Sequence, residues 1–232
     1  MGLFPEAIPA VLFVWTAVAF ALMMTVFHHR RLAAKMPDDQ AYYRYFFFFF
    51  VMFMAVPVLI VCLGSARPMG FLSAAGFSPG KWRLGLVLAG IGVPIGALSA
   101  AIGSRDPRMK EQYPFSKRVC ASAGKLAAFE TAYLVLYYLP WEFLFRGILF
   151  FPLVPALGLV PALAVQAALS TLYHFGHPDS EVFAALGAGF AFGLIAWVTG
   201  SFFYTVFIHA FIGVSTDVFL YRRYSRRPAR HA

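Results

Sequence analysis

Residues 45–63 read YFFFFFVMFMAVPVLIVCL, and this stretch contains no charged side chain. As an α-helix it would rise about 30 Å, which is the thickness of the hydrocarbon core of a bilayer. We therefore interpret the run as a transmembrane helix. Its five consecutive phenylalanines, 46–50, are expected to pack towards lipid, and Pro57 predicts a kink within the helix.

The composition of the whole chain extends this interpretation. Of the 232 residues, 61% are hydrophobic and 12% are charged, whereas soluble domains average about 45–50% apolar and about 25% charged residues. A soluble fold of this size could not bury so much apolar surface, and the 27 Phe and 11 Tyr exclude a disordered chain. We expect a single all-α polytopic membrane domain over residues 1–232. The two cysteines, Cys62 and Cys120, are expected on opposite sides of the membrane and without a disulfide.

Seven apolar runs predict about seven transmembrane helices. They are residues 8–27, 45–63, 84–102, a run that starts near residue 127, 159–175, 182–198 and 202–220. The chain is accordingly divided into N-terminal spans and loops (1–126), a C-terminal helical part (127–221) and a basic tail (222–232). In the third run, Gly92 and Gly96 are four residues apart, which predicts close packing against another helix.

The distribution of basic residues predicts the orientation. With the N-terminus outside and seven crossings, the inside segments 28–44, 104–125 and 222–232 hold 15 of the 19 Lys and Arg residues. Cytoplasmic loops carry such an excess, so we expect the N-terminus outside and the C-terminus inside. The basic blocks flank apolar runs, which indicates contacts with anionic membrane lipids and not with nucleic acid.

Six ionisable residues fall in or beside the apolar runs, where a charge costs several kcal/mol and marks a candidate functional site. They are Glu130, Glu142, Arg146, His174, His209 and Asp217. Glu142 and Arg146 are four residues apart on one helix, so their side chains can meet. The alternative is a buried ion pair that only fixes helix packing. Glu130 points about 120° away from Glu142 around the helix and is interpreted as structural.

Two histidines are predicted to lie near that pair. If the fourth and fifth runs form a hairpin about Gly158, Glu142 and His174 are each 16 residues from the turn and therefore lie at matching depth. His209 and Asp217, eight residues apart, share one face of the last helix. The alternative there is a structural hydrogen bond between the His and Asp side chains.

These residue types point to water activation. A carboxylate with a His partner can take a proton from water, and a second His can donate to a developing oxyanion. Alternatively, two His and a carboxylate could bind a catalytic Zn²⁺ with one open position.

Three ordered motifs carry a family resemblance. They are Trp141-Glu-Phe-Leu-Phe-Arg146, Ser170-Thr-Leu-Tyr-His174 and His209-Ala-Phe-Ile-Gly213. Over about residues 130–217 the sequence resembles the CAAX prenyl protease and bacteriocin-processing family, also called the type II CAAX protease or abortive-infection family. The family pattern is a Glu-Glu-x-x-x-Arg helix, a Phe-x-x-x-His segment and a late His-x-x-x-Asn helix.

The resemblance implies an intramembrane endopeptidase that hydrolyses a peptide bond of a membrane-associated or lipidated peptide or protein. It also implies a four-helix catalytic core within residues 127–221, a site open to the cytoplasm, a prokaryotic inner membrane as the location, and a link to bacteriocin processing. Family members are commonly described as metalloproteases. A divalent metal such as Zn²⁺, held by His174 and His209, is therefore a candidate cofactor.

The sequence departs from the family pattern at three positions. Trp141 stands where the family has the Glu that is its preferred general base, Ser170 replaces a Phe, and Gly213 replaces the Asn. The residues that carry over are Glu142, Arg146, His174 and His209. The candidates for the base are Glu142, Glu181 and Asp217, and the resemblance indicates that Glu181 is a compensating acid.

Two other functions remain open. Trp141 and Gly213 are consistent with a non-catalytic family member that acts as a membrane scaffold or immunity protein. The intramembrane acids and histidines are also consistent with a transporter, although the sequence has no internal repeat.

Overall fold

The computed structural model describes residues 7–225, and these residues form helices and no named strand. Six helices in this part of the chain are long and apolar enough to cross a membrane, which confirms the all-α membrane class. Their bounds are Ala7–Ala33, Asp38–Gly64, Trp82–Gly103, Ala123–Leu157, Asp179–Thr199 and Phe203–Arg222. The basic tail predicted at 222–232 lies outside the described residues from 226 onwards.

Several of these long helices are rods made of two or more consecutive helical elements. The first half of the chain contains α1 (Ala7–Met24), α2 (His29–Ala33), α3 (Asp38–Phe50), the π-helical turn η1 (Val51–Ala55), α4 (Val56–Gly64), α5 (Pro68–Ala74), α6 (Trp82–Gly103), α7 (Pro107–Gln112) and the 3₁₀ turn η2 (Lys117–Ala121). The second half contains α8 (Ala123–Tyr133), the π-helical turn η3 (Leu134–Tyr138), α9 (Leu139–Glu142), the π-helical turn η4 (Phe143–Ile148), α10 (Phe150–Leu157), α11 (Leu159–Leu172), α12 (Asp179–Thr199) and α13 (Phe203–Ser225).

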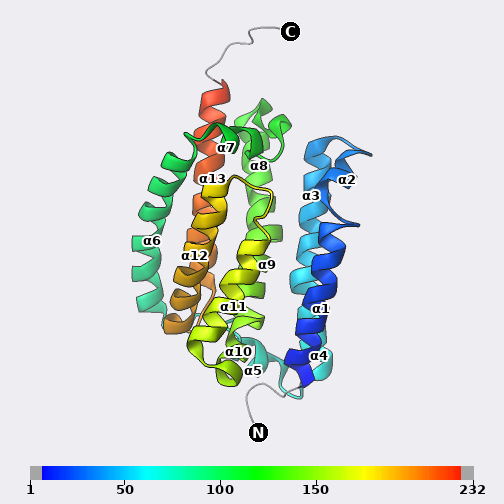
Figure 1. The fold of residues 1–232 in the computed structure, drawn as a ribbon, viewed down its shortest axis with the longest axis vertical. Coiled ribbons are helices and arrows are strands. Elements are labelled where there is room, and N and C mark those ends of the chain that lie inside the picture. Colours follow the sequence, from blue (N-terminus) through cyan, green and yellow to red (C-terminus); the bar gives the residue numbers. More distant parts are fainter. Residues whose placement is uncertain (1–6, 226–232) are drawn as a thin grey trace.

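The fifth predicted span is shorter than expected. The chain reverses at Gly158, whose φ of 86° is readily adopted only by glycine, and the following helix α11 ends at Leu172 after 14 residues. That length rises about 21 Å, which is less than the hydrocarbon thickness. Residues 7–225 therefore contain six helices that are long and apolar enough to cross a membrane and one short apolar helix, where the sequence predicted about seven spans. In Figure 1, α1 starts at the lower end of the molecule and α13 ends at the upper end.

The π-helical turns lie next to prolines and on the central rod. The turn η1 ends two residues before Pro57, and η3 ends two residues before Pro140. Proline lacks an N–H and clashes with the preceding turn, and a wider π turn accommodates it. The helix 38–64, in which a kink was predicted at Pro57, thus contains a π turn next to that proline. The rod α8–α10, with η3 and η4, carries both Glu142 and Arg146.

An aromatic core joins α3 to this rod. Phe46, Phe49 and Phe53 are fully buried, whereas Phe47 is 55% exposed. The lipid-facing packing predicted for all of 46–50 is therefore wrong for two of the five phenylalanines. Helical periodicity explains this outcome, because residues 46, 49 and 53 share one face and that face meets the rod. Phe46 stacks on Tyr133 with ring centroids 4.7 Å apart.

The helices α6 and α13 pack through glycines. A Cβ atom at Gly92 would lie 2.6 Å from the Ile208 side chain, and one at Gly96 would lie 2.5 Å from Ile212. Close packing at this small-residue pair was predicted from the sequence, and the contacts confirm it. Cys62 and Cys120 are both free, as expected.

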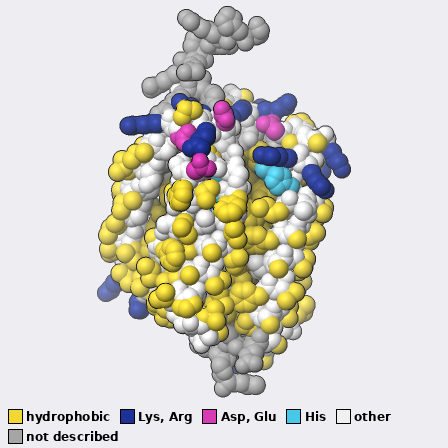
Figure 2. Space-filling view, viewed as in Figure 1, with side chains coloured by type: hydrophobic (Ala, Val, Ile, Leu, Met, Phe, Trp, Pro, Cys, Tyr) yellow, Lys and Arg dark blue, Asp and Glu magenta, His cyan; other side chains and the backbone are white. Residues whose placement is uncertain are grey.

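The surface has the character of a membrane protein. Figure 2 shows apolar side chains over the middle of the visible face, Lys and Arg gathered at its upper end, and a few at its lower end. Exposed large hydrophobic residues are common on the outer helices, for example Leu86, Ile95 and Leu98 on α6. This band of exposed apolar side chains is expected of a protein in a bilayer, because the side chains that face outwards there contact lipid tails and not water.

Candidate active site

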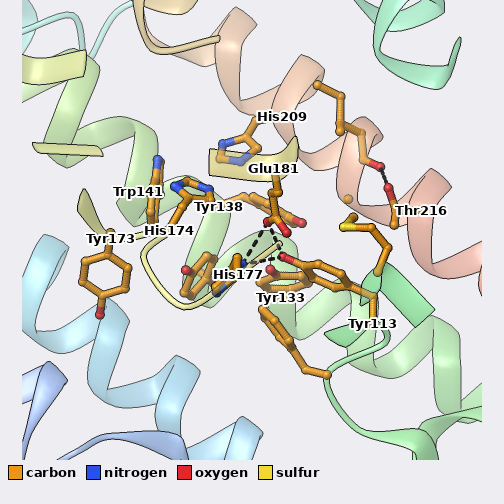
Figure 3. A pocket seen from close by; sticks show the side chains of 15 residues that line it. Tyr113, Tyr133, Tyr138, Trp141, Tyr173, His174, His177, Glu181, His209 and Thr216 are labelled. Atoms are coloured by element: carbon orange, nitrogen blue, oxygen red, sulfur yellow. Dashed lines mark hydrogen bonds and ion pairs between the residues drawn. The ribbon is translucent and has the colours of Figure 1, made fainter. Parts of the chain in front are cut away.

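A cavity of about 110 Å³ lies between the central rod, the segment before η2, the loop 173–178 and α13. The ionisable side chains that line it are His174, His177, Glu181 and His209, together with the hydroxyls of Tyr113, Tyr133, Tyr137, Tyr138, Tyr173 and Thr216. In the view of Figure 3, Glu181 lies between His209 on one side and His177 and Tyr113 on the other. Three of the six predicted site residues, His174, Glu181 and His209, thus face one cavity.

Glu181 is held at the cavity by two hydrogen-bond partners. The Tyr113 hydroxyl donates to Glu181 Oε1 at 2.6 Å, and His177 Nδ1 lies 3.0 Å from the same oxygen (Figure 3). The second oxygen, Oε2, is buried and has no hydrogen-bond partner among the residues that the structure describes. A buried carboxylate oxygen without a donor is costly. A bound water or a substrate N–H would therefore be stabilised at Oε2.

The Nε2 atom of His174 is free to interact with a molecule in the cavity. Its Nδ1 lies 2.9 Å from the Ser170 carbonyl oxygen, so Nδ1–H donates to that carbonyl and Nε2 carries the lone pair. Burial in the loop, partly offset by the nearby Glu181 carboxylate, lowers the pKa of His174 to about 4. The imidazole is therefore neutral at pH 7 and able to accept a hydrogen bond at Nε2.

Glu142 does not line the cavity but orients His209. The Glu142 side chain is completely buried, and its Oε1 lies 2.7 Å from His209 Nδ1. Its Oε2 lies 3.3 Å from Arg146 Nε, so the ion pair predicted from the four-residue spacing is present. Because His209 Nδ1–H donates to Glu142, the opposite nitrogen Nε2 is the one available to the cavity.

Asp217 lies away from the cavity. It is 1% exposed, and its carboxyl group neighbours that of Glu130 on α8. Apart from each other, the two carboxyl groups have no hydrogen-bond partner among the described side chains. The hydrogen bond considered between His209 and Asp217 is absent, because His209 pairs with Glu142. His209 and Asp217 do share one face of α13, but the eight residues between them correspond to about 12 Å along the helix axis, which is too far for their side chains to meet.

Trp141 forms the wall between the two histidines. It is 1% exposed, and its ring makes edge-to-face contacts with His174 and His209 at centroid distances of 5.2 Å and 5.9 Å. The indole therefore separates the two histidine rings and offers no proton-accepting group to the cavity.

Sequence reasoning missed the tyrosines. Tyr138 precedes Trp141 by three residues, which places both on one helix face and could have indicated its position. Tyr113 lies in a polar loop far from Glu181 in the sequence, and no local sequence pattern links the two residues. Its role depends on α7 packing near the start of α12, where Arg108 and Asp179 form an ion pair at 3.1 Å.

The described side chains do not form a metal-holding set. No group of three or more His, Cys, Asp or Glu residues within 7–225 is arranged to hold a metal ion. His174 and His209 both face the cavity, but a catalytic zinc site requires a third protein ligand converging with them. The residues at this cavity therefore do not fit a catalytic zinc.

Part of the helical bundle matches a known protein family. Residues 125–215 match the Rce1-like family model, described as type II CAAX prenyl endopeptidase Rce1-like. The match starts in α8 and ends in α13, and it includes Glu142, His174, Glu181 and His209. It confirms the family resemblance over this segment and supports a protease-like enzyme embedded in a membrane. No curated protein and no solved structure matches the chain.

Proposed function

We propose that this protein is an intramembrane endopeptidase in which Glu181, His174 and His209 act around one water. Its substrate would be a peptide bond of a membrane-associated or lipidated peptide or protein. The observation that carries the proposal is that Glu181, whose Oε2 has no hydrogen-bond partner among residues 7–225, lines a cavity that His174 and His209 also line. Glu181 would then supply the carboxylate that the family pattern has at the position of Trp141.

The proposed reaction starts with a water hydrogen-bonded to Glu181 Oε2. As the water oxygen attacks the carbonyl carbon of the scissile bond, Glu181 takes one proton. His174 Nε2 accepts the second hydrogen bond of the water and orients it. When the tetrahedral intermediate collapses, the C–N bond breaks and the proton on Glu181 passes to the leaving amine. Glu181 then ends the cycle ionised.

His209 is proposed to stabilise the developing oxyanion. With both ring nitrogens protonated, His209 donates through Nε2 to the oxyanion while Nδ1–H stays on the Glu142 carboxylate. Glu142 and Arg146 are in this scheme positioning residues, since neither lines the cavity.

The test is cleavage of lipidated peptides by the purified protein in proteoliposomes, read by mass spectrometry. We expect Glu181→Gln and His174→Ala to lower cleavage at least 100-fold while the unfolding temperature stays close to that of the wild type. Asp39→Asn is the control, because Asp39 is an acid at the start of α3 that lies outside the cavity and takes no part in the Arg108–Asp179 ion pair. It should keep full activity. Wild-type rates in Glu181→Gln would contradict the assignment of the base.

A non-catalytic role is the second candidate, and the burial of Trp141 between the histidines favours it. Such a protein would keep the family fold as a scaffold or immunity protein. It predicts no cleavage by the wild type on any of the lipidated peptides. Hydrolysis that disappears in His174→Ala would exclude it.

We also propose the setting of this enzyme. Residues 1–232 would form one domain with its catalytic core at 127–221, its N-terminus outside, and its cavity open to the cytoplasm of a prokaryotic cell. The gathering of Lys and Arg at the end of the molecule nearest the loops 28–44 and 104–125 supports this orientation. A role in bacteriocin processing is a narrower proposal that rests on the family resemblance.

A further inference from the structure

Gly213 on α13 leaves a space that another residue fills. It lies one helical turn after His209, and a Cβ atom placed on it would overlap the Tyr138 hydroxyl and lie 2.6 Å from Tyr138 Cζ. No side chain at position 213 is compatible with this placement of Tyr138. The glycine and the tyrosine are therefore matched, and the hydroxyl occupies the volume of a side chain on α13.

Tyr138 enters this space from the opposite element, η3, and lies beside His209. The two rings make an edge-to-face contact with centroids 4.8 Å apart, and both residues line the cavity (Figure 3). The phenol is thus fixed next to the imidazole whose Nδ1 is tied to Glu142. A hydroxyl held in this way needs little rearrangement to donate into the cavity.

The donor capacity of Tyr138 differs from that of Tyr113 and Tyr173, two other tyrosines of the cavity. The Tyr113 hydroxyl is committed to Glu181, and the Tyr173 hydroxyl pairs with that of Tyr45 at 2.9 Å. The neighbour of the Tyr138 hydroxyl is another hydroxyl, that of Tyr133. A phenol oxygen can accept one hydrogen bond while its own O–H donates another. Tyr138 can therefore accept from Tyr133 and still donate to a substrate.

From this geometry we infer that the Tyr138 hydroxyl, together with His209, donates a hydrogen bond to the oxyanion formed at the scissile carbonyl. The inference rests on the proposed peptidase function and adds a catalytic residue to it. No bond is made or broken at Tyr138, because it keeps its proton throughout. Removing one donor of this kind lowers kcat by about 10²–10³ in other hydrolases.

The first experiment compares Tyr138→Phe with Tyr43→Phe in proteoliposomes, because Tyr43 lies on α3 outside the cavity. We expect Tyr138→Phe to lower kcat about 100-fold with KM nearly unchanged, because the ring and its packing remain. Tyr43→Phe should change kcat less than about 5-fold. A purely structural role would instead lower the unfolding temperature or raise KM. Wild-type kcat in Tyr138→Phe overturns the inference.

The second experiment uses the match between positions 138 and 213. Tyr138→Ala should lose activity, and adding Gly213→Asn in the same chain should restore part of it, because an amide donor then enters the vacated space. Gly213→Asn alone should unfold or inactivate the protein, since its side chain meets the phenol. A double variant no more active than Tyr138→Ala contradicts the inference.

A binding measurement separates this inference from the proposed function. A peptide phosphonate carries a tetrahedral anion, and we expect Tyr138→Phe to bind it about 100-fold more weakly than the wild type. If Glu181→Gln is inactive while Tyr138→Phe keeps full kcat and full affinity, only the role of Tyr138 is wrong. A wild-type protein that neither cleaves peptides nor binds the phosphonate overturns both.

Discussion

At the scale of single residues, the position of a carboxylate decides what it can do. Glu142 carries over from the family pattern, yet its oxygens face His209 and Arg146 and it has no surface in the cavity. Glu181 is weakly marked in the sequence, yet it reaches the cavity with one oxygen unpartnered. The difference arises from the fold around each acid.

The buried pair of Glu142 and Arg146 leads to a prediction about stability. Arg146→Met leaves the fully buried Glu142 carboxylate without its arginine and with His209 as its remaining partner, and should lower the free energy of unfolding by about 3–5 kcal/mol. The double variant Glu142→Leu/Arg146→Met removes both charges and should be more stable than Arg146→Met. Thermal unfolding in detergent measures the difference. A double variant that is less stable than the single variant would show that the buried carboxylate does not depend on its cation.

The environment of His174 leads to a prediction about pH. Its pKa is lowered to about 4 in the folded protein from an ordinary value of 6.5, chiefly because the side chain is buried. Between these values the unfolded chain binds a proton that the folded chain does not, so acid favours unfolding. This contribution to stability is complete above about pH 6.5 and is lost as the pH falls towards 4.

The measurement is the unfolding temperature from about pH 7.5 to about pH 4 for the wild type and His174→Gln, a range that brackets both pKa values. Glu181 and His177 neighbour this side chain and are present in both proteins. We expect the wild type to lose more stability than His174→Gln over this range. Parallel curves for the two proteins would rule out a depressed pKa at His174.

At the scale of helices, glycine positions determine which elements can approach. On α6, Gly92 faces Ile208 of α13, whereas nothing lies within 4 Å of a Cβ at Gly90. We expect Gly92→Val to lower the free energy of unfolding by about 1–3 kcal/mol through overpacking. Gly90→Val, on the same helix, should stay close to the wild type. Equal effects of the two variants in thermal unfolding would show that α6 does not pack through Gly92.

Local sequence patterns were sufficient for some features of the fold and insufficient for others. Apolar length and helical spacing predicted the membrane helices, the Glu142–Arg146 pair and the packing at Gly92, because each depends on one or two neighbouring elements. They did not predict that Phe46 and Phe49 are buried, since lipid and protein core are equally apolar.

In the candidate site, too, some residues could be predicted from local sequence patterns and others could not. Glu142 and His174 were expected at matching depth because equal distances from a turn place residues at equal depth, and of these two only His174 lines the cavity. Tyr113 and Tyr138 were missed because their contacts with Glu181 and Gly213 join segments more than 60 residues apart. Asp217 was a candidate for the base, but packing turns it towards Glu130.

At the scale of the whole molecule, the basic end and the apolar belt define how the protein sits in a membrane (Figure 2). In a variant with Cys62 and Cys120 replaced by Ala, single cysteines can report the side of each loop. Ala66 is exposed before α5, and Gly124 is exposed at the start of α8. An impermeant maleimide added to intact cells should label Ala66→Cys and not Gly124→Cys, and permeabilisation should expose both. The reverse pattern would invert the proposed orientation.

The shortness of α11 has a consequence for the lipids beside it. A helix that rises about 21 Å cannot match a hydrocarbon layer of about 30 Å, and the bilayer compensates for such hydrophobic mismatch by thinning locally. Thinning next to the loop 173–178 would bring head groups and water down to the histidines. Acyl-chain length would then act on this enzyme, because thicker membranes make that deformation more costly.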